Sequence, residues 1–288
     1  MEQAMILFAQ KEKRILKMKE EVSRLGITPK LAVVVCDGYD QSSTRYVNNK
    51  KKIATEIGIE CEVVNIEWRG LDEETLFKNI LVTLNRLNQN DKVNGIIVQL
   101  PLPLSQKKQE VICNSVYSTK DVDGFNVLNL GKTIKGLDGF ISCTPLGIMN
   151  MLDDYNIEVE GKRVAVIGRS KHVGMPLVNL LINRGATVVS CNSKTKEIEK
   201  ILREQDVVIS AVGKPKIWNK DHFNKNVTVI DVGINVDNNN KLCGDLDVED
   251  VKTKILAYSP VPGGVGIMTV LALMENVIKS CKKYKKIG

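Results

Sequence analysis

Short runs of apolar residues alternate with longer amphipathic stretches along nearly the whole chain. The runs cover residues 31–35, 95–100, 163–167, 187–191, 206–211 and 227–232, and residues 62–68 form a further strand-like segment in which apolar and polar positions partly alternate. Continuous apolar runs this short are typical of strands that are buried on both faces of a sheet. Strands that alternate with helices predict parallel sheets with right-handed crossovers, so we expect an α/β fold built from repeated strand–helix units.

The stretches between these runs have the spacing of helices, and the chain of 288 residues suits two domains. We expect helices at 11–25, 43–57, 71–88, 105–116, 144–156, 174–184, 195–203 and 268–283. The change of domain falls near residues 140–160, where no flexible linker is evident. Because the last helix can pack back on the first domain, we expect residues 1–143 and 268–288 in one domain and residues 144–267 in the other.

The strand at 163–167 leads into a glycine turn that is typical of a phosphate-binding site. Gly168 ends the strand and Gly174 stands where the next helix begins, with Arg169 and Ser170 inside the turn. Free backbone N–H groups and the positive end of a helix dipole would point to one place there. The spacing G-x-S-x-x-x-G is one residue longer than the standard dinucleotide fingerprint, so the turn alone is a weak signal of a Rossmann-type domain.

The end of the next strand indicates which dinucleotide would bind. A free ribose 2′-OH calls for Asp or Glu at this point, whereas residues 192–196 read Asn-Ser-Lys-Thr-Lys. Two hydroxyls, two lysines and the nearby Arg169 favour an extra phosphate, so the sequence predicts NADP rather than NAD. The alternative, that the lysines only keep a loop hydrated, stays open.

Three polar side chains fall where ligand crevices of α/β folds open. Tyr46 and Lys50 are four residues apart on a predicted helix and therefore share one face. Gln99 ends a buried strand and is followed by Leu-Pro-Leu-Pro. All three should lie near the carboxyl edge of a parallel sheet, which makes them candidate site residues.

The loop Lys120–Gly124 carries two aspartates, Asp121 and Asp123. An aspartate in a turn commonly accepts hydrogen bonds from its own backbone, and we expect this of at least one of them. No third carboxylate with metal-loop spacing follows, so we expect no metal. His172 and His222 have no evident carboxylate or serine partner and receive no catalytic role.

The composition and the net charge limit the classes of partner that we expect the protein to bind. The net charge of +7 comes largely from short lysine clusters, aromatic residues make up only 5%, and no basic stripe with aromatics indicates nucleic-acid binding. No window resembles a membrane span or a secretory signal, so we expect no membrane partner. Seven cysteines without a C-x-x-C pair indicate a reducing compartment, hence a cytoplasmic location.

Seven motifs in order resemble one known family over nearly the full chain. They are Tyr46-Val-x-x-Lys50, Val98-Gln-Leu-Pro-Leu-Pro103, Lys120-Asp-Val-Asp-Gly124, Cys143-Thr-Pro145, Gly168-Arg-Ser-x-x-Val-Gly-x-Pro176, Asp231-Val-Gly-Ile234 and Pro260-Val-Pro-Gly-Gly-Val-Gly266. Together they resemble the bifunctional methylenetetrahydrofolate dehydrogenase/methenyltetrahydrofolate cyclohydrolase family, called FolD in bacteria. The resemblance implies a folate-binding catalytic domain, a Rossmann-type NADP-binding domain and a cleft between them, in a homodimer that serves one-carbon metabolism and purine biosynthesis.

The resemblance also implies roles for individual residues. Lys50 would be the catalytic lysine, with Gln99 hydrogen-bonded to it and Tyr46 against the folate ring system. Asp123 would hold the pterin, and Gly264 to Thr269 would lie near folate and nicotinamide. The cofactor would contact Gly168, Arg169, Ser170, Gly174, Ser193, Ile234 and Thr269. The implied reaction is oxidation of 5,10-methylenetetrahydrofolate with NADP, followed by hydrolysis of the methenyl product to 10-formyltetrahydrofolate.

Some positions depart from the family pattern, and three alternatives stay open. The loop 36–43 is longer than usual, Ile267 stands where the family has Pro, and Asn192 where His is frequent. The alternatives are a dehydrogenase without cyclohydrolase activity that uses NAD, a catalytically silent nucleotide-binding regulator, and a shikimate-dehydrogenase-like enzyme. Lys50 and Gln99 count against loss of the cyclohydrolase activity, and the acid-free end of the strand at 187–191 counts against NAD. Gln99 and the Asp-Val-Asp-Gly loop count against the shikimate-dehydrogenase-like enzyme, and the regulator stays open.

Overall fold

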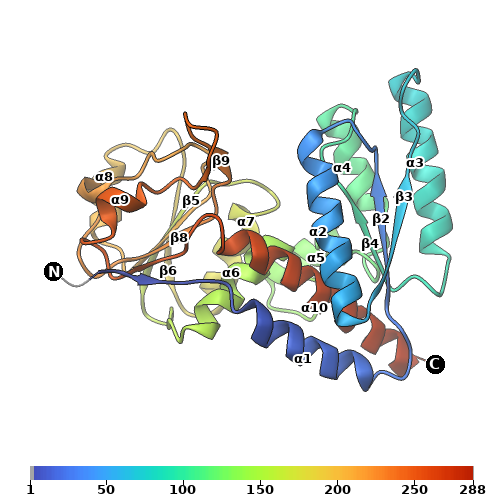
Figure 1. Cartoon of the computed structure of the whole chain (residues 1–288), viewed down its shortest axis with the longest axis horizontal. Helices are drawn as coiled ribbons and strands as arrows, with labels where there is room; N and C mark the ends of the chain where they lie inside the picture. Colours follow the sequence, from blue (N-terminus) through green and yellow to red (C-terminus); the bar gives the residue numbers. More distant parts are fainter. Residues whose placement is uncertain (1–2, 288) are drawn as a thin grey trace. The chain divides into compact units, whose positions relative to one another are not determined.

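The computed structural model describes residues 3–287, and the chain divides into two compact units. The three-stranded unit comprises residues 12–132, 138–143 and the chain from Leu273 onward. The six-stranded unit comprises the chain up to Lys11, residues 133–137 and residues 144–272. Figure 1 traces both units, each of which is described here by itself.

The three-stranded unit is a parallel sheet with helices beside it (Figure 1). The strand order is β3-β2-β4, and Val33 of β2 pairs with Val63 and Ile97 of its two neighbours. Leucines and isoleucines of α3 and α4 pack on one face of the sheet, so these helices bury their apolar stripes there. Its elements are α1 (Lys11–Ser23), β2 (Lys30–Val35), α2 (Gln41–Ile57), β3 (Glu60–Asn65), α3 (Glu73–Asn88), β4 (Gly95–Val98), α4 (Gln106–Ser115) and α5 (Val127–Ile134).

The six-stranded unit holds a parallel sheet in the order β1-β11-β8-β7-β5-β6. Its elements are β1 (Met5–Ile6), α6 (Cys143–Asp154), β5 (Arg163–Ile167), α7 (Gly174–Asn183), β6 (Thr187–Cys191), α8 (Ile198–Arg203), β7 (Val207–Ser210), η1 (Lys220–His222), β8 (Thr228–Asp231), α9 (Val248–Val251) and β11 (Ala257–Tyr258). A separate antiparallel pair joins β9 (Asn235–Val236) to β10 (Leu242–Cys243), and α10 (Val265–Ile287) follows.

The order of strands in this sheet creates a switch point beside β5. The chain runs from β5 to β6 on one side, and then crosses to β7 on the other side of β5. Ligands of open α/β sheets bind outside the carboxyl ends of the strands at such a point. The turns that follow β5 and β7 therefore mark the place where a ligand of this unit is expected.

The expected α/β fold is confirmed, whereas several short elements had no signal in the sequence. Strand β1 pairs with β11, and Leu7 beside it is fully buried. The first residues therefore group with the six-stranded unit, whereas the sequence led us to expect them in the first domain. A two-residue strand is too short to show periodicity. Helix α5 was also missed, because Val127 and Leu128 at its start are exposed and do not mark a buried stripe.

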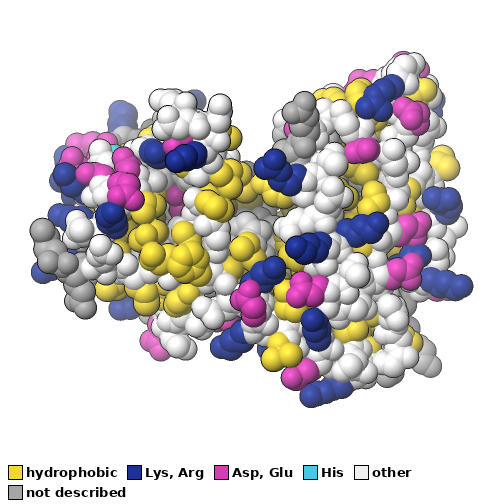
Figure 2. Space-filling model, in the orientation of Figure 1, with side chains coloured by type: hydrophobic (Ala, Val, Ile, Leu, Met, Phe, Trp, Pro, Cys, Tyr) yellow, Lys and Arg dark blue, Asp and Glu magenta, His cyan; other side chains and the backbone are white. Residues whose placement is uncertain are grey.

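Charged side chains of both signs are interspersed on the face shown in Figure 2. Lysines and arginines stand among aspartates and glutamates there, and hydrophobic side chains show between them. Among the residues described, no helix is both long enough and apolar enough to cross a membrane.

Candidate functional site

Helix α2 and the end of β4 bring an amine and an amide together. Lys50 Nζ donates a 2.7 Å hydrogen bond to Gln99 Oε1, and the Gln99 amide nitrogen donates to Leu100 O at 2.9 Å. The backbone N–H of Gln99 donates to Val34 O, which continues the sheet by one residue. The Gln99 side chain is therefore held so that its oxygen faces Lys50, as the family resemblance implied.

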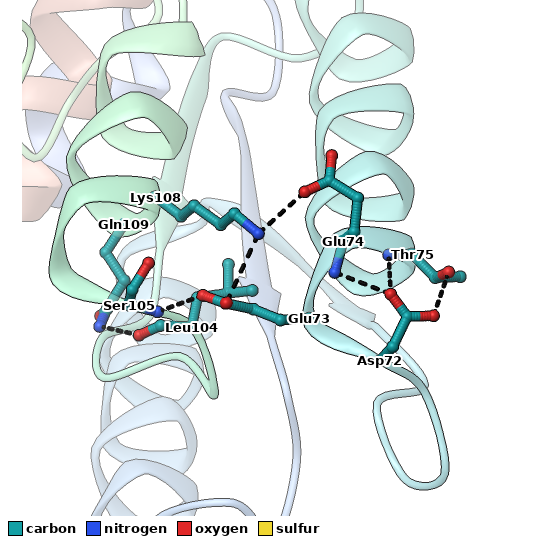
Figure 3. A network of polar contacts seen from close by, with 8 residues as sticks. All are labelled: Asp72, Glu73, Glu74, Thr75, Leu104, Ser105, Lys108 and Gln109. Carbon is teal, nitrogen blue, oxygen red and sulfur yellow. Dashed lines mark hydrogen bonds and ion pairs between the residues drawn. The ribbon is translucent and has the colours of Figure 1, made fainter.

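The segment after Gln99 is tied to the starts of α3 and α4 (Figure 3). Gln109 accepts from Leu102 N at 3.1 Å and donates to Leu104 O at 2.8 Å. Ser105 N donates to Glu73 Oε1 at 2.6 Å, and Lys108 forms ion pairs with Glu73 and Glu74. These bonds hold residues 102–105, just after Gln99, in place without backbone hydrogen bonds between strands.

Tyr46 lies one turn before Lys50 on α2 and is half-buried. Burial raises the pKa of its phenol, so the ring is neutral at physiological pH. Two side chains at this spacing on one helix extend from the same face. The structure thus places Tyr46, Lys50 and Gln99 in one unit, with the latter two in contact.

The two aspartates of the Lys120–Gly124 loop have different environments. Asp121 is buried, and its carboxylate accepts from Phe125 N, Asn126 N and Asn129 Nδ2 at 3.2, 2.8 and 2.9 Å. Burial raises the pKa of Asp121 to about 6. The expectation that one aspartate would bond its own loop is confirmed for Asp121, whereas Asp123 is half-buried.

Cys143 is a buried thiol at the start of α6, and the charges of Lys50 and Asp123 both act on it. Its Sγ donates to Val122 O at 3.4 Å. Burial raises the pKa of the thiol well above its ordinary value; the charge of Asp123 adds to this shift and that of Lys50 opposes it. Cys143 therefore shares an electrostatic environment with Lys50 and Asp123, a neighbourhood that sequence spacing did not reveal.

The glycine turn after β5 forms a cradle that side chains would fill. A β-carbon on Gly168, which has φ +112°, would lie 2.5 Å from Ala211 O in the turn after β7. A β-carbon on Gly174 would collide with Gly168 O. Only glycine allows the two turns and the start of α7 to come this close, which fits a bound pyrophosphate at the helix N-terminus.

Three backbone N–H groups at the end of this turn already have acceptors within the chain, contrary to the expectation. The Ser170 hydroxyl accepts from Val173 N and Gly174 N at 3.2 and 3.4 Å, and Ser170 O accepts from Met175 N. The extra residue in the motif makes room for this serine, which caps the helix. A ligand would compete with the Ser170 hydroxyl for these donors, or bind through the hydroxyl.

The turn after β6 lies beside the turn after β5. Gly168 N donates to Cys191 O at 2.9 Å, and Asn192 Oδ1 accepts from Lys194 N at 2.9 Å. Arg169 and Ser193 are both exposed on these adjacent turns. The first acid after β6, Glu197, is paired with Lys200 at 2.5 Å.

The remaining predicted residues of the six-stranded unit lie after β8 and at the start of α10. Ile234 is three residues past β8 and is 51% exposed. Gly264 is buried, and a β-carbon there would lie 2.6 Å from Pro260 O. Thr269 donates to Val265 O at 3.0 Å and shares a 3.1 Å hydrogen bond with Thr144.

Two buried aspartates lie at the carboxyl edge of this sheet, and the sequence analysis assigned no role to either of them. Asp231 ends β8 and Asp245 follows β10; they are 2% and 0% exposed. Burial raises the pKa of Asp231 to about 6. The glycines beside them were the one local feature in the sequence that pointed to this close approach. A β-carbon on Gly233 would overlap the Asp245 carboxylate, and one on Gly244 would overlap the Asp231 carboxylate.

In the described part of the chain, no three His, Cys, Asp or Glu side chains are grouped so that they could hold a metal ion. The polar groups described in the two units are instead an amine, amides, hydroxyls and carboxylates. This set suits organic ligands and nucleotide phosphates.

A parallel sheet with a glycine cradle at its switch point defines the six-stranded unit as a dinucleotide-binding α/β domain. Two family models match the chain: the catalytic domain of tetrahydrofolate dehydrogenase/cyclohydrolase over residues 7–123, and the NAD(P)-binding domain of the same family over residues 142–285. The chain therefore belongs to the tetrahydrofolate dehydrogenase/cyclohydrolase family.

Individual relatives agree with this assignment. The bifunctional protein FolD of Campylobacter hominis is 43% identical over 277 residues, which cover 94% of this chain and 95% of that protein. The crystal structure of bifunctional FolD from Campylobacter jejuni has a TM-score of 0.90 at 40% identity, covering 96% of this chain and 97% of that one. The Trypanosoma brucei FolD structure, complexed with NADP and an inhibitor, has a TM-score of 0.89 at 29% identity and covers 98% and 99%.

Proposed function

We propose that this protein oxidises 5,10-methylenetetrahydrofolate to 5,10-methenyltetrahydrofolate with NADP and hydrolyses the product to 10-formyltetrahydrofolate. The hydrogen bond between Lys50 and Gln99, in a chain of this family, is the observation that carries the proposal. We assign folate binding to the three-stranded unit and NADP binding to the six-stranded unit.

Hydride transfer depends on the correct placement of the reacting carbon more than on a general base. Loss of hydride leaves a methenyl cation that is stabilised by resonance over two nitrogens, so no proton has to leave in that step. NADP, when bound, accepts the hydride. Asp123 accepts hydrogen bonds from the pterin amino and ring N–H groups, and the neutral ring of Tyr46 packs against the folate ring system. These contacts hold the reacting carbon in place.

The hydrolysis step needs proton transfer, which Lys50 supplies. Water adds to the cationic carbon and loses one proton, which gives a neutral hydroxyl adduct. The bond from that carbon to N5 then breaks as the hydroxyl loses its remaining proton to solvent and becomes the formyl carbonyl, and N5 takes up a proton. A positive carbon beside Lys50 favours the neutral amine, which accepts the proton of the water and returns it to N5. Gln99 Oε1 accepts from Lys50 and holds the amine in place.

Residues on two adjacent turns support NADP over NAD. Arg169 and Ser193 are exposed at the ends of neighbouring strands, where the ribose 2′-phosphate would lie. The first acid after β6, Glu197, is paired with Lys200, and no acid stands at the end of β6 to accept a 2′-OH. Gly168, Ser170 and Gly174 hold the pyrophosphate, and Ile234, Gly264 and Thr269 lie toward the nicotinamide.

We propose a homodimer formed through the six-stranded unit, and the edge of its sheet supports this. Strand β6 is the last strand of the sheet, and Val189 on β6 and Ile182 on α7 are 37% and 53% exposed. Unpaired edge strands with exposed apolar side chains are prone to pair with a second copy. The seven free cysteines fit a cytoplasmic enzyme of one-carbon metabolism that supplies formyl groups for purine biosynthesis.

A spectrophotometric assay with methylenetetrahydrofolate and either NADP⁺ or NAD⁺ tests the proposal. Reduced NADP should accumulate without a matching amount of methenyl product, because the same chain hydrolyses it. Methenyl product that rises in step with reduced NADP would refute the hydrolase activity, and no reduction with either cofactor would refute the enzyme.

A further inference from the structure

Asp245 is fully buried, yet its carboxylate is surrounded by hydrogen-bond donors. An isolated buried charge is costly, so this group is tolerated only while its donors stay in place. Oδ2 accepts from Ser210 Oγ at 2.7 Å, Val212 N at 2.8 Å and Gly213 N at 3.4 Å, and Oδ1 accepts from Lys214 N at 3.0 Å and Asn235 Nδ2 at 2.9 Å.

The second carboxylate holds Asp245 itself in position. Asp231 Oδ1 accepts from Asp245 N at 3.0 Å and from Gly233 N at 2.9 Å, and Oδ2 accepts from Leu246 N at 2.8 Å. The end of β8 is thereby joined to the segment that carries Asp245. Because Asp231 belongs to the sheet, the position of Asp245 is set by the sheet and not by a flexible loop.

The segment that Asp245 holds lies at the switch point of the sheet. Residues 212–214 directly follow β7, the neighbour of β5. Ala211 O, one residue earlier, is the atom that a β-carbon on Gly168 would meet. Asn235, the fifth donor, adjoins Ile234. One carboxylate therefore fixes both the turn opposite the phosphate cradle and the segment expected near the nicotinamide.

We propose that Asp245 is a positioning residue for the dinucleotide: it preorganises residues 212–214 and Asn235 before the cofactor binds. This inference rests on the proposed function and deepens it. Three successive backbone N–H groups that converge on one carboxylate cannot reorient freely. A loop that is already ordered loses little conformational entropy when a ligand binds, so the bonds of Asp245 contribute to affinity without touching the ligand.

The variant Asp245→Asn tests this role, because all five groups around the carboxylate are donors. The NH₂ group of an asparagine would replace either Oδ1 or Oδ2 and would then face donors instead of accepting from them. Residues 212–214 would lose hydrogen bonds in either orientation. Amide hydrogen exchange at residues 212–214 should accelerate by at least about 10-fold. The dissociation constant for NADP⁺ should rise by about 10-fold or more, while hydrolysis of supplied methenyltetrahydrofolate stays unchanged.

Asp237→Asn is the matched control. Asp237 is also a carboxylate that accepts from two backbone N–H groups, those of Asn239 and Lys241, but it holds the turn between β9 and β10. Exchange in that turn should accelerate in the control, and NADP⁺ affinity should not change. Equal loss of affinity in both variants would overturn the specific role of Asp245.

The wild-type protein provides a test that needs no variant. Its amides at residues 212–214 should be protected in the free protein as well as in the presence of NADP⁺. Exchange at the rate of an unstructured peptide in the free protein, or normal NADP⁺ affinity in Asp245→Asn, would overturn the proposal. Wild-type protein that binds no NADP⁺ at all would instead overturn the proposed function, and the cofactor role of Asp245 with it.

Discussion

Lys50 Nζ lies 2.7 Å from Gln99 Oε1, although 49 residues separate the two along the chain. The contact joins the middle of α2 to the end of β4. It holds the amine by an acceptor that is itself uncharged. The amide oxygen positions the amine through a hydrogen bond and places no negative charge beside it.

Replacement of Lys50 should separate the two activities. Lys50→Met keeps the length of the side chain and removes the amine, so hydrolysis should fall by at least about 100-fold. Hydride transfer, which depends on position, should fall by less than about 10-fold. Methenyl product would then accumulate together with reduced NADP. Lys52→Met, at an exposed position on the same helix, is the control; equal loss of both activities in Lys50→Met with folate still bound would contradict the division of roles.

Gln109 and Lys108 of α4, both drawn in Figure 3, should differ in how much their contacts stabilise the protein. Gln109→Leu leaves Leu102 N and Leu104 O without their partner, which should cost about 1–3 kcal/mol of stability and lower hydrolysis through Gln99. Lys108→Met removes two ion pairs at the surface and a cation–π contact with the Phe77 ring, and it should cost less stability than Gln109→Leu. Urea unfolding measures both, and similar losses in the two variants would contradict this ranking.

Arg169 should decide between the two dinucleotides. If Arg169 binds the 2′-phosphate as proposed, Arg169→Ala removes a charge-assisted hydrogen bond, which corresponds to a rise in KM for NADP⁺ of about 10-fold to 100-fold. KM for NAD⁺ should change little, because NAD⁺ lacks that phosphate. Arg163→Ala, at the start of β5 where Arg163 pairs with Glu204, is the control. A parallel rise for both cofactors would place Arg169 elsewhere in the site.

Gly244 is required where Asp231 lies against it. A β-carbon at this position would overlap the buried carboxylate, so Gly244→Ala should destabilise the protein by about 1–3 kcal/mol. Gly131→Ala provides the contrast, because it lies within α5 with open space around it and alanine favours helix, by up to about 1 kcal/mol. Thermal unfolding of both variants tests the difference in sign.

The buried carboxyls predict an unusual dependence of stability on pH. The pKa values of Asp121 and Asp231 are both raised to about 6 by burial, above that of an unfolded aspartate. Between about pH 4 and 6 the folded state therefore binds more protons than the unfolded state, and stability falls as pH rises through this range. Each group contributes at most about 3 kcal/mol.

Urea unfolding at pH 5 and at pH 7.5 measures this effect. The free energy of unfolding should be higher at pH 5, and Asp121→Asn should reduce the difference because it removes one titrating group. At lower pH the trend reverses, since Lys279 and Lys283 lower the pKa of Asp138 to about 2 and their bonds to it are lost on protonation. A free energy that rises steadily from pH 5 to 7.5 would contradict the prediction.

The sequence by itself determined the features that are local in the chain. Apolar runs predicted β2, β4, β5, β7 and β8, because a strand buried on both faces is a continuous apolar run that can be identified from adjacent residues alone. Glycines marked the turn after β5, and helical spacing put Tyr46 and Lys50 on one face. These properties depend on neighbouring residues alone.

Only the tertiary structure decided which distant groups meet. It brought Lys50 to Gln99, set Asp245 against Asp231, and paired β1 with β11 at opposite ends of the chain. It also showed that Ser170 occupies N–H groups that the motif alone leaves free. Such contacts join residues that share no period, because chain crossovers and strand order, rather than local preference, set which polar groups face each other in the interior.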